Sequence, residues 1–234
     1  MKLDKLIPQT IKAKLVVLID PDKFNPDLIK LCNKSKVAFF LVGGSELKKN
    51  NLSEVISSIK KISKKPVIIF PGNETQISKN ADGMLLLNLI SGRNPDYLIG
   101  KHVKAAKTIV RSKIETWPTG YILIHGSKIS TTQRVTKTEA LKNLDEIVST
   151  ALAGELLGSK AIYLEAGSGA KEEVNTKIIK AVRKEISLPL FVGGGINSYS
   201  KAKKAADAGA NFVVVGNALE KNIYLLTEIE KAFK

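Results

Sequence analysis

The sequence predicts a (β/α)8 barrel that forms a single domain over residues 1–234. A chain of 234 residues has the length of one such barrel. Its apolar, β-branched runs are continuous rather than alternating, as in parallel strands buried on both faces, and helical patterns separate them. The last two runs end in glycine, at 191–195 (FVGGG) and 213–217 (VVVGN). In these barrels the loops after strands 7 and 8 commonly bind phosphate.

Eight runs are expected to be strands. The alternative fold, a doubly wound open sheet, needs a glycine-rich nucleotide fingerprint after its first strand, and residues 20–23 (DPDK) are not one. The expected strands are Leu15–Ile19, Val37–Val42, Val67–Phe70, Met84–Leu87, Tyr121–Ile124, Ala161–Leu164, Leu190–Val192 and Phe212–Val215.

Helices are expected between the strands. Apolar residues recur with helical spacing from Leu52 to Ile59, and again over most of Thr138–Leu157. Two connections, Asn88–Pro118 and Gly126–Lys137, are longer than a minimal barrel requires. Long loops at the active end of a barrel usually determine specificity or act as a lid, so we expect that role here.

The charge balance is strongly basic, since 37 Lys and Arg exceed 22 Asp and Glu by 15. Only four of these residues are arginine and only 6% of the chain is aromatic, which argues against nucleic-acid binding. Solvated helix faces account for most of the lysines. Attraction to anionic substrates, or transient contact with an anionic membrane surface, is the functional alternative.

The cysteine content and the length of the apolar runs indicate the cellular compartment of the protein. One cysteine, Cys32, excludes an internal disulfide and any multi-cysteine metal site, and its apolar neighbours favour a buried helix position. No run approaches the ~20 apolar residues of a membrane span, and charges interrupt the first residues. We expect a soluble, cytoplasmic protein.

Oxygen ligands follow the first two strands. Asp20 ends strand 1, and Ser45 follows two glycines after strand 2. A carboxylate and a hydroxyl at neighbouring strand ends suit Mg²⁺ beside a phosphorylated ligand. The structural alternative is a helix-start turn, and for Asp22 we favour a capping role.

Strand 6 ends in the heptad Tyr163–Gly169 (YLEAGSG). Tyr163 and Glu165 alternate with Leu164, so both are expected to face the barrel mouth while Leu164 packs outward. A carboxylate there can act as a general base, although a glycine-rich turn with one solvated glutamate remains the alternative. His125, after strand 5, is expected to be a polar wall residue, and no zinc site is expected.

Together these strand ends resemble the geranylgeranylglyceryl phosphate synthase family, which includes the heptaprenylglyceryl phosphate synthases. The heptad after strand 6 is the most specific match, and the others recur singly in other phosphate-binding barrels. The matching segments run in order along the whole chain: Ile19–Lys23, Val42–Ser45, Pro71–Asn73, Ser91–Tyr97, Tyr163–Gly169, Val192–Ile196 and Val215–Asn217.

The resemblance implies transfer of a prenyl group, expected to be geranylgeranyl, from its diphosphate to the sn-3 hydroxyl of sn-glycerol 1-phosphate. It implies Mg²⁺ as cofactor on Asp20 and Ser45, and Glu165 as the catalytic residue. Because a barrel interior is packed, the prenyl tail must leave through the side or the mouth. Contacts to sn-glycerol 1-phosphate are implied for Tyr163, Leu164, Glu165, Ala166, Gly167, Ser168, Gly169, Gly194, Gly195, Gly216 and Asn217.

The loop after strand 6, the oligomeric state and the function each have more than one interpretation. Relatives often carry prolines directly after the strand-6 glycines, where this chain has Lys171–Glu173, so the resemblance does not define that loop. A homo-oligomer is expected, with Trp117 or Tyr97 as a candidate interface aromatic, although a core role for Trp117 fits equally well. The functional alternatives are another phosphate-binding barrel enzyme of sugar-phosphate metabolism and a non-catalytic barrel that binds anionic lipid.

Overall fold

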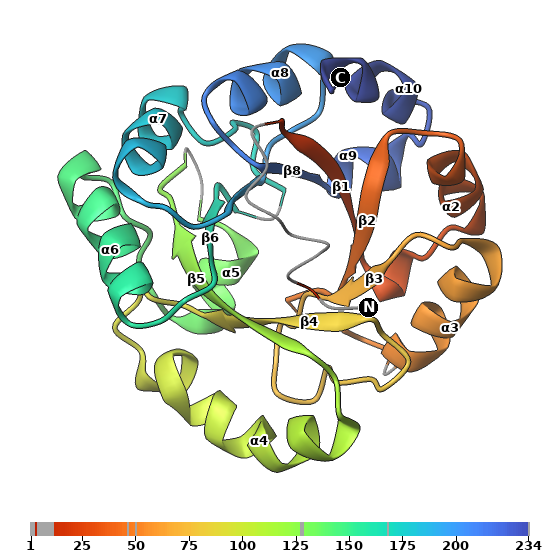
Figure 1. Cartoon of the computed structure of the whole chain (residues 1–234), viewed down its shortest axis with the longest axis horizontal. Helices are drawn as coiled ribbons and strands as arrows, with labels where there is room; N and C mark the ends of the chain where they lie inside the picture. Colours follow the sequence, from red (N-terminus) through yellow and green to blue (C-terminus); the bar gives the residue numbers. More distant parts are fainter. Residues whose placement is uncertain are drawn as a thin grey trace.

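Eight parallel strands close into a barrel in the order of the chain, with β1 hydrogen-bonded to β8 (Figure 1). The computed structural model describes residues 3, 12–45, 47–49, 51–126, 129–167 and 169–233. The fold class predicted from the sequence is confirmed. The strands are β1 (Lys14–Ile19), β2 (Val37–Val42), β3 (Val67–Ile69), β4 (Gly83–Asn88), β5 (Thr116–Leu123), β6 (Ala161–Glu165), β7 (Leu190–Gly193) and β8 (Phe212–Val215).

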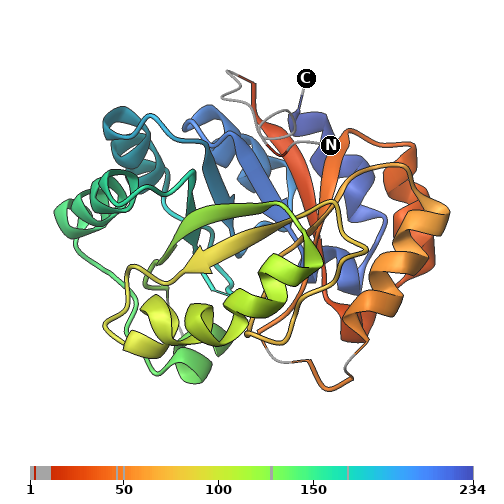
Figure 2. The ribbon, with the colours of Figure 1, turned by 60° about the horizontal axis from the view of Figure 1, so that its bottom comes forward.

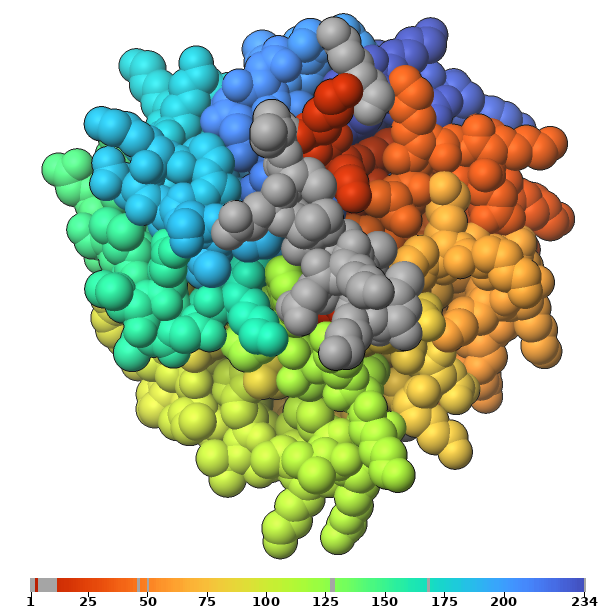
Figure 3. All heavy atoms as spheres, viewed as in Figure 1, coloured from red at the N-terminus to blue at the C-terminus, as the bar shows by residue number. Residues whose placement is uncertain are grey.

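Helices surround the strands (Figure 1), and in the space-filling view the sequence colours run around the rim of the molecule in order from red to blue (Figure 3). Helix α4 lies along the outside of β4 and β5 (Figure 2). The α-helices are α2 (Pro26–Asn33), α3 (Leu52–Ile62), α4 (Lys101–Ser112), α5 (Thr131–Thr136), α6 (Leu144–Leu156), α7 (Thr176–Glu185), α8 (Tyr199–Asp207), α9 (Asn217–Lys221) and α10 (Leu225–Ile229). Short 3-10 turns η1 (Pro21–Lys23) and η3 (Glu230–Ala232) and a π-helical turn η2 (Asp96–Gly100) complete the described elements.

Aromatic side chains fill the barrel interior. The Phe191 and Phe212 rings stack with centroids 4.5 Å apart, and Tyr163 stacks on Phe191 at 5.9 Å. Phe39 packs against the same group, and all four side chains are fully buried. Because close-packed rings leave no channel, a long ligand has to reach the mouth from the side.

The second apolar layer lies between the strands and the helices. The stripe expected on α3 is buried from Leu52 to Ile59, and Lys60 and Lys61 occupy its last turn, where cations are favourable to the helix dipole. Cys32 of α2 is fully buried in this layer, and burial raises the pKa of its thiol to about 12. The predicted buried helix position of Cys32 is confirmed.

Two boundaries differ from the prediction by more than one residue. Strand β5 begins at Thr116 rather than Tyr121, so Trp117 is a buried core residue. The helix expected from Thr138 begins only at Leu144, because Asn143 caps it and Leu141 pairs with Ile124 in an isolated parallel bridge.

The two long connections contain regular structure. Most of Asn88–Pro118 consists of η2, α4 and the start of β5. Part of Gly126–Lys137 forms α5, which begins with a capping box between Ser130 and Gln133. In the part of the chain that the structure describes, no helix is both long and apolar enough to cross a membrane.

Candidate active site

The side chains of β6 alternate as predicted. Tyr163 belongs to the apolar cluster inside the barrel, whereas Leu164 packs into the layer beneath the helices. Glu165 ends the strand and is 6% exposed. The alternative of a solvated glutamate is therefore wrong, and a carboxyl group is buried at the C-terminal end of the barrel, where barrel enzymes carry their active sites.

The surroundings of Glu165 tune its ionisation. Burial raises the pKa of its carboxyl group to about 7, an effect that hydrogen bonding to Gly167 and the proximity of the Tyr163 hydroxyl partly offset. Its Oε1 atom accepts a hydrogen bond of 2.7 Å from the amide of Gly167. A carboxyl group with a pKa near neutrality can hold or release a proton at physiological pH, as a general base must.

The hydroxyl of Tyr163 is buried at the same place and has no hydrogen-bond partner among the described residues. It occupies the space left by the missing side chain of Gly193, since a Cβ atom there would lie 2.2 Å from it. Burial raises the pKa of this phenol well above its usual value, so it stays protonated and can donate. An unpaired buried donor beside a carboxyl group suits a polar ligand at this point.

The glycines after β7 approach Glu165 closely. Gly194 has φ of +82°, and a Cβ atom on it would lie 2.4 Å from Oε1 of Glu165 and 2.9 Å from the amide nitrogens of Ala166 and Gly167. Gly195 has φ of +70° and packs against the carbonyl of Glu172. Only glycine fits both the backbone conformation and the contact at these positions.

The loop after β6 meets the start of α9. The amide of Gly169 donates to Oδ1 of Asn217 over 3.3 Å, and Gly216 packs against Leu18 of β1. The structure therefore brings together the predicted residues after β6, β7 and β8. Ser168, the remaining member of the predicted set, lies outside the described residues.

Asp20 lies at the same mouth, beside the glycine that precedes Ser45. Oδ1 of Asp20 lies 3.5 Å from the Cβ position of Gly44, the residue before Ser45. The same oxygen accepts the amide of Asp22 at 3.0 Å, so Asp20 caps η1. The capping role predicted for Asp22 is wrong: its two oxygens accept the amides of Lys48 and Lys49 at 2.6 and 3.0 Å, which ties down the loop after β2.

The donor set at Asp20 and Ser45 fits a magnesium ion that a phosphorylated substrate helps to hold. Mg²⁺ in such sites takes one or two carboxylates and completes its shell with water and phosphate oxygens. Among the described residues, no group of three or more His, Cys, Asp or Glu side chains is placed to hold a metal by itself. A carboxylate and a hydroxyl on neighbouring strand ends agree with a site in which the protein and the substrate both supply ligands to the ion.

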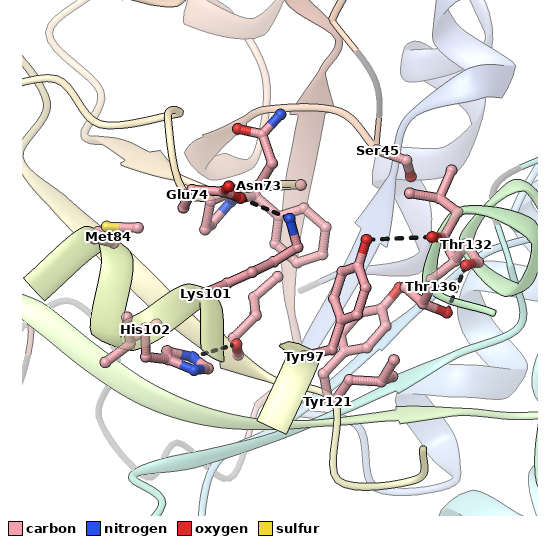
Figure 4. A pocket seen from close by; sticks show the side chains of 18 of the residues that line it. Ser45, Asn73, Glu74, Met84, Tyr97, Lys101, His102, Tyr121, Thr132 and Thr136 are labelled. Carbon is pink, nitrogen blue, oxygen red and sulfur yellow. Dashed lines mark hydrogen bonds and ion pairs between the residues drawn. The ribbon is translucent and has the colours of Figure 1, made fainter. Parts of the chain in front are cut away.

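An apolar groove opens beside this pair, between β4 and α4 (Figure 4). Its cavity volume is about 110 Å³. Ser45 lies at one end, while Met84, Ala105 and Ile109 line the part beneath α4. The prediction that the interior is packed is confirmed, and this groove runs along the side of the barrel.

Polar groups stand at the edge of the groove. Lys101 Nζ lies 2.6 Å from Oε2 of Glu74 and 5.0 Å from the centre of the Tyr97 ring. The Tyr121 hydroxyl bonds Thr132 of α5 (Figure 4). Sequence reasoning missed Glu74, Lys101 and Thr132 because no spacing in the chain signals contacts between separate helices and loops.

His125 follows β5 and is exposed. The sequence predicts a polar wall residue there, and nothing in the structure assigns it a further role.

Fold and site define a (β/α)8 barrel whose mouth gathers a buried carboxyl group, glycine loops and an apolar groove. The model of the PcrB family matches residues 8–233, so the chain belongs to the PcrB family. A geranylgeranylglyceryl phosphate synthase of Chitinophaga pinensis is 42% identical over 222 residues, or 92% of this chain and 88% of the relative. One from Pyrococcus horikoshii is 36% identical over 227 residues, or 94% and 89%.

Solved structures agree with this assignment. The chain resembles the crystal structure of (S)-3-O-geranylgeranylglyceryl phosphate synthase from Thermoplasma acidophilum in complex with sn-glycerol-1-phosphate. The TM-score is 0.93 at 32% identity, and the match covers 100% of this chain and 99% of the other. A thiamine phosphate pyrophosphorylase from Pyrococcus furiosus has a TM-score of 0.61 at 13% identity, over 99% and 97% of the two chains, and shares the fold alone.

Proposed function

We propose that this protein transfers a prenyl group from a prenyl diphosphate to the sn-3 hydroxyl of sn-glycerol 1-phosphate, giving an ether and diphosphate. The observation that carries the proposal is the buried Glu165 carboxyl group, with its pKa of about 7, set against the glycine loops after β6 and β7. Family membership and the relatives' names support the reaction.

Glu165 is the general base in this proposal. It accepts the proton of the sn-3 hydroxyl while the hydroxyl oxygen bonds to the first carbon of the prenyl chain and the diphosphate leaves with the bonding electrons. Gly167 holds the carboxyl group in place through its amide, and the unpaired Tyr163 hydroxyl offers a hydrogen bond to the glycerol part. The amides of Gly194, Gly195 and Gly216 and the side chain of Asn217 surround the phosphate position.

Asp20 and Ser45 would hold Mg²⁺ together with the prenyl diphosphate. When bound, the ion would offset the negative charge that develops on the departing diphosphate. The clustering of Asp20 with Gly44 supports this arrangement.

The groove between β4 and α4 takes the prenyl tail. It begins at Ser45, which belongs to the proposed metal site, and continues along Met84, Ala105 and Ile109. Burying an isoprenoid chain there gains roughly 25 cal/mol for each Å² of apolar surface removed from water. Geranylgeranyl is our proposed chain, following the relatives' names.

The test is product formation from purified protein. It is incubated with sn-glycerol 1-phosphate, Mg²⁺ and radiolabelled prenyl diphosphates that span roughly C10 to C35, with EDTA and sn-glycerol 3-phosphate as controls. We expect an ether product that EDTA abolishes and that sn-glycerol 3-phosphate does not give. No product with any donor would turn the account towards another phosphate-binding barrel enzyme.

A further inference from the structure

Lys23 lies between the two halves of the proposed site. Its Nζ atom is 2.8 Å from Oε2 of Glu220 and 3.4 Å from Oδ2 of Asp20. A charged ammonium group is therefore shared by the carboxylate proposed to hold the metal and by a carboxylate of α9.

Glu220 connects Lys23 to Asn217, which lies on the side of the mouth proposed to bind phosphate. Its Oε2 atom also accepts Nδ2 of Asn217 at 3.3 Å. With the amide nitrogen facing Glu220, Oδ1 of Asn217 faces the amide of Gly169, also at 3.3 Å. The Glu220 carboxylate is only 14% exposed, so its charge acts at short range on the loop after β6.

We propose that Lys23 is a positioning residue that couples the two substrate sites through Glu220 and Asn217. The proposal rests on the function proposed above. With a divalent cation held at Asp20, the Lys23 ammonium group would lose the Asp20 carboxylate and stay paired with Glu220 alone. A fully neutralised Glu220 no longer repels a phosphate group beside Asn217. Binding of the metal with its diphosphate therefore favours binding of glycerol phosphate.

Calorimetry of the full chain tests the coupling without turnover. sn-Glycerol 1-phosphate is titrated once in EDTA and once with Mg²⁺ and inorganic diphosphate as the probe of the other half-site. For the unaltered protein we expect Mg²⁺ and diphosphate to tighten binding about threefold to tenfold. Lys23→Met should bind glycerol phosphate more weakly in EDTA and lose the tightening.

Two further variants sharpen the result. Lys30→Met removes a lysine that pairs with Asp27 at 2.9 Å on the neighbouring helix, and it should behave like the unaltered protein. In Glu220→Gln, Asp20 is the remaining carboxylate partner of Lys23. The lysine then competes more strongly with Mg²⁺ for Asp20, so Mg²⁺ binding should weaken and the coupling should be lost. The two variants should change the affinity for Mg²⁺ in opposite directions, with tighter binding in Lys23→Met and weaker binding in Glu220→Gln. Loss of folding would weaken Mg²⁺ binding in both.

Three outcomes would overturn the proposal. If Lys23→Met keeps the tightening, the metal acts on the phosphate directly through space and not through Lys23. If the unaltered protein binds glycerol phosphate equally well in both titrations, the sites are not coupled, and the proposed function still stands. If it binds no glycerol phosphate in either titration, the proposed function itself is wrong.

Discussion

Lys201 of α8 donates a hydrogen bond of 3.1 Å from Nζ to the carbonyl oxygen of Gly195. The same ammonium group bonds the carbonyl of Lys171 at 2.8 Å and Oε2 of Glu173 at 3.1 Å. One side chain thus fastens the segment Lys171–Glu173 onto the glycine loop of the proposed phosphate site. This is the segment where the family resemblance leads one to expect prolines, and here an ion pair supplies the restraint.

Removing this clamp should loosen the phosphate site. In Lys201→Met, the link between Gly195 and the segment Lys171–Glu173 is lost, so we expect the Kd for sn-glycerol 1-phosphate to rise about threefold to tenfold. Calorimetry measures the change. Lys203→Met is the matched control, because Lys203 lies on the same helix and its ion pair is with Asp207, at 2.9 Å. Equal effects in the two variants would contradict a role for Lys201 in the site.

A methyl group on Gly194 should displace Glu165. The added Cβ would lie 2.4 Å from Oε1 of the carboxyl group, in a backbone with φ of +82°. We expect Gly194→Ala to lower product formation at least about 100-fold, since the base and the phosphate loop both move. Initial rates at saturating prenyl diphosphate measure it.

Gly158→Ala controls for backbone strain. Gly158 has φ of +89° with no atom within 4 Å of its Cβ position, so the substitution adds strain without a clash. It should destabilise the fold by about 1 kcal/mol and leave the rate unchanged. A comparable loss of activity in this variant would mean that strain, and not contact with Glu165, explains the effect at Gly194.

Glu165 should make stability depend on pH. Its pKa is about 7 in the folded protein against 4.5 for the free side chain, so the folded state binds the proton more tightly. The stabilisation is complete below about pH 4.5 and is lost as pH rises through 7. In Glu165→Gln there is no proton to lose. We expect this variant to be more stable than the unaltered protein at pH 8, by up to about 3 kcal/mol, and equally stable at pH 4.

Urea denaturation at several pH values measures this difference. The side-chain amide introduced by Glu165→Gln keeps an oxygen that can accept the backbone amide of Gly167, so packing changes little. A stability difference that stays constant from pH 4 to pH 8 would show that the Glu165 carboxyl group is not perturbed in the folded protein.

The groove should limit the prenyl chain. Ala105 is buried on the face of α4 that lines it. Ala105→Phe places a ring in the groove, so we expect longer prenyl diphosphates to lose kcat/KM by at least about tenfold, while the shortest donors change little. Ala106→Phe, at an exposed position of the same helix, is the control. An equal loss for all chain lengths would place the tail elsewhere.

Most of the barrel follows from the sequence alone, because continuous apolar runs between helical patterns require buried parallel strands. The strands that contain Leu41, Ile162 and Val214 were predicted without any knowledge of tertiary contacts. Strand β5 began earlier than predicted, since Pro118 and Gly120 have low strand propensity and only pairing with β4 makes them extended. Leu141 was assigned to a helix for the opposite reason: its spacing is helical, but its partner is Ile124.

Some residues of the candidate site were also predictable from the sequence, and others were not. Tyr163 and Glu165 were predictable because alternation along a strand fixes which side chains face inward. Asp22 was misjudged, since its partners lie on the loop after β2, at Lys48 and Lys49. Lys201, Glu220 and the groove under α4 depend on packing between distant segments, which leaves no local pattern. The metal, the oligomeric state and the roles of individual site residues stay predictions.

The central claim is that Glu165 removes the proton of the glycerol phosphate hydroxyl during prenyl transfer. The most direct measurement is single-turnover ether formation by the unaltered protein and by Glu165→Gln, with both substrates and Mg²⁺ saturating. We expect product from the unaltered protein and a rate lower by about 100-fold or more in the variant, with glycerol phosphate affinity nearly retained. Equal rates in the two proteins, or no ether product from the unaltered one, would contradict it.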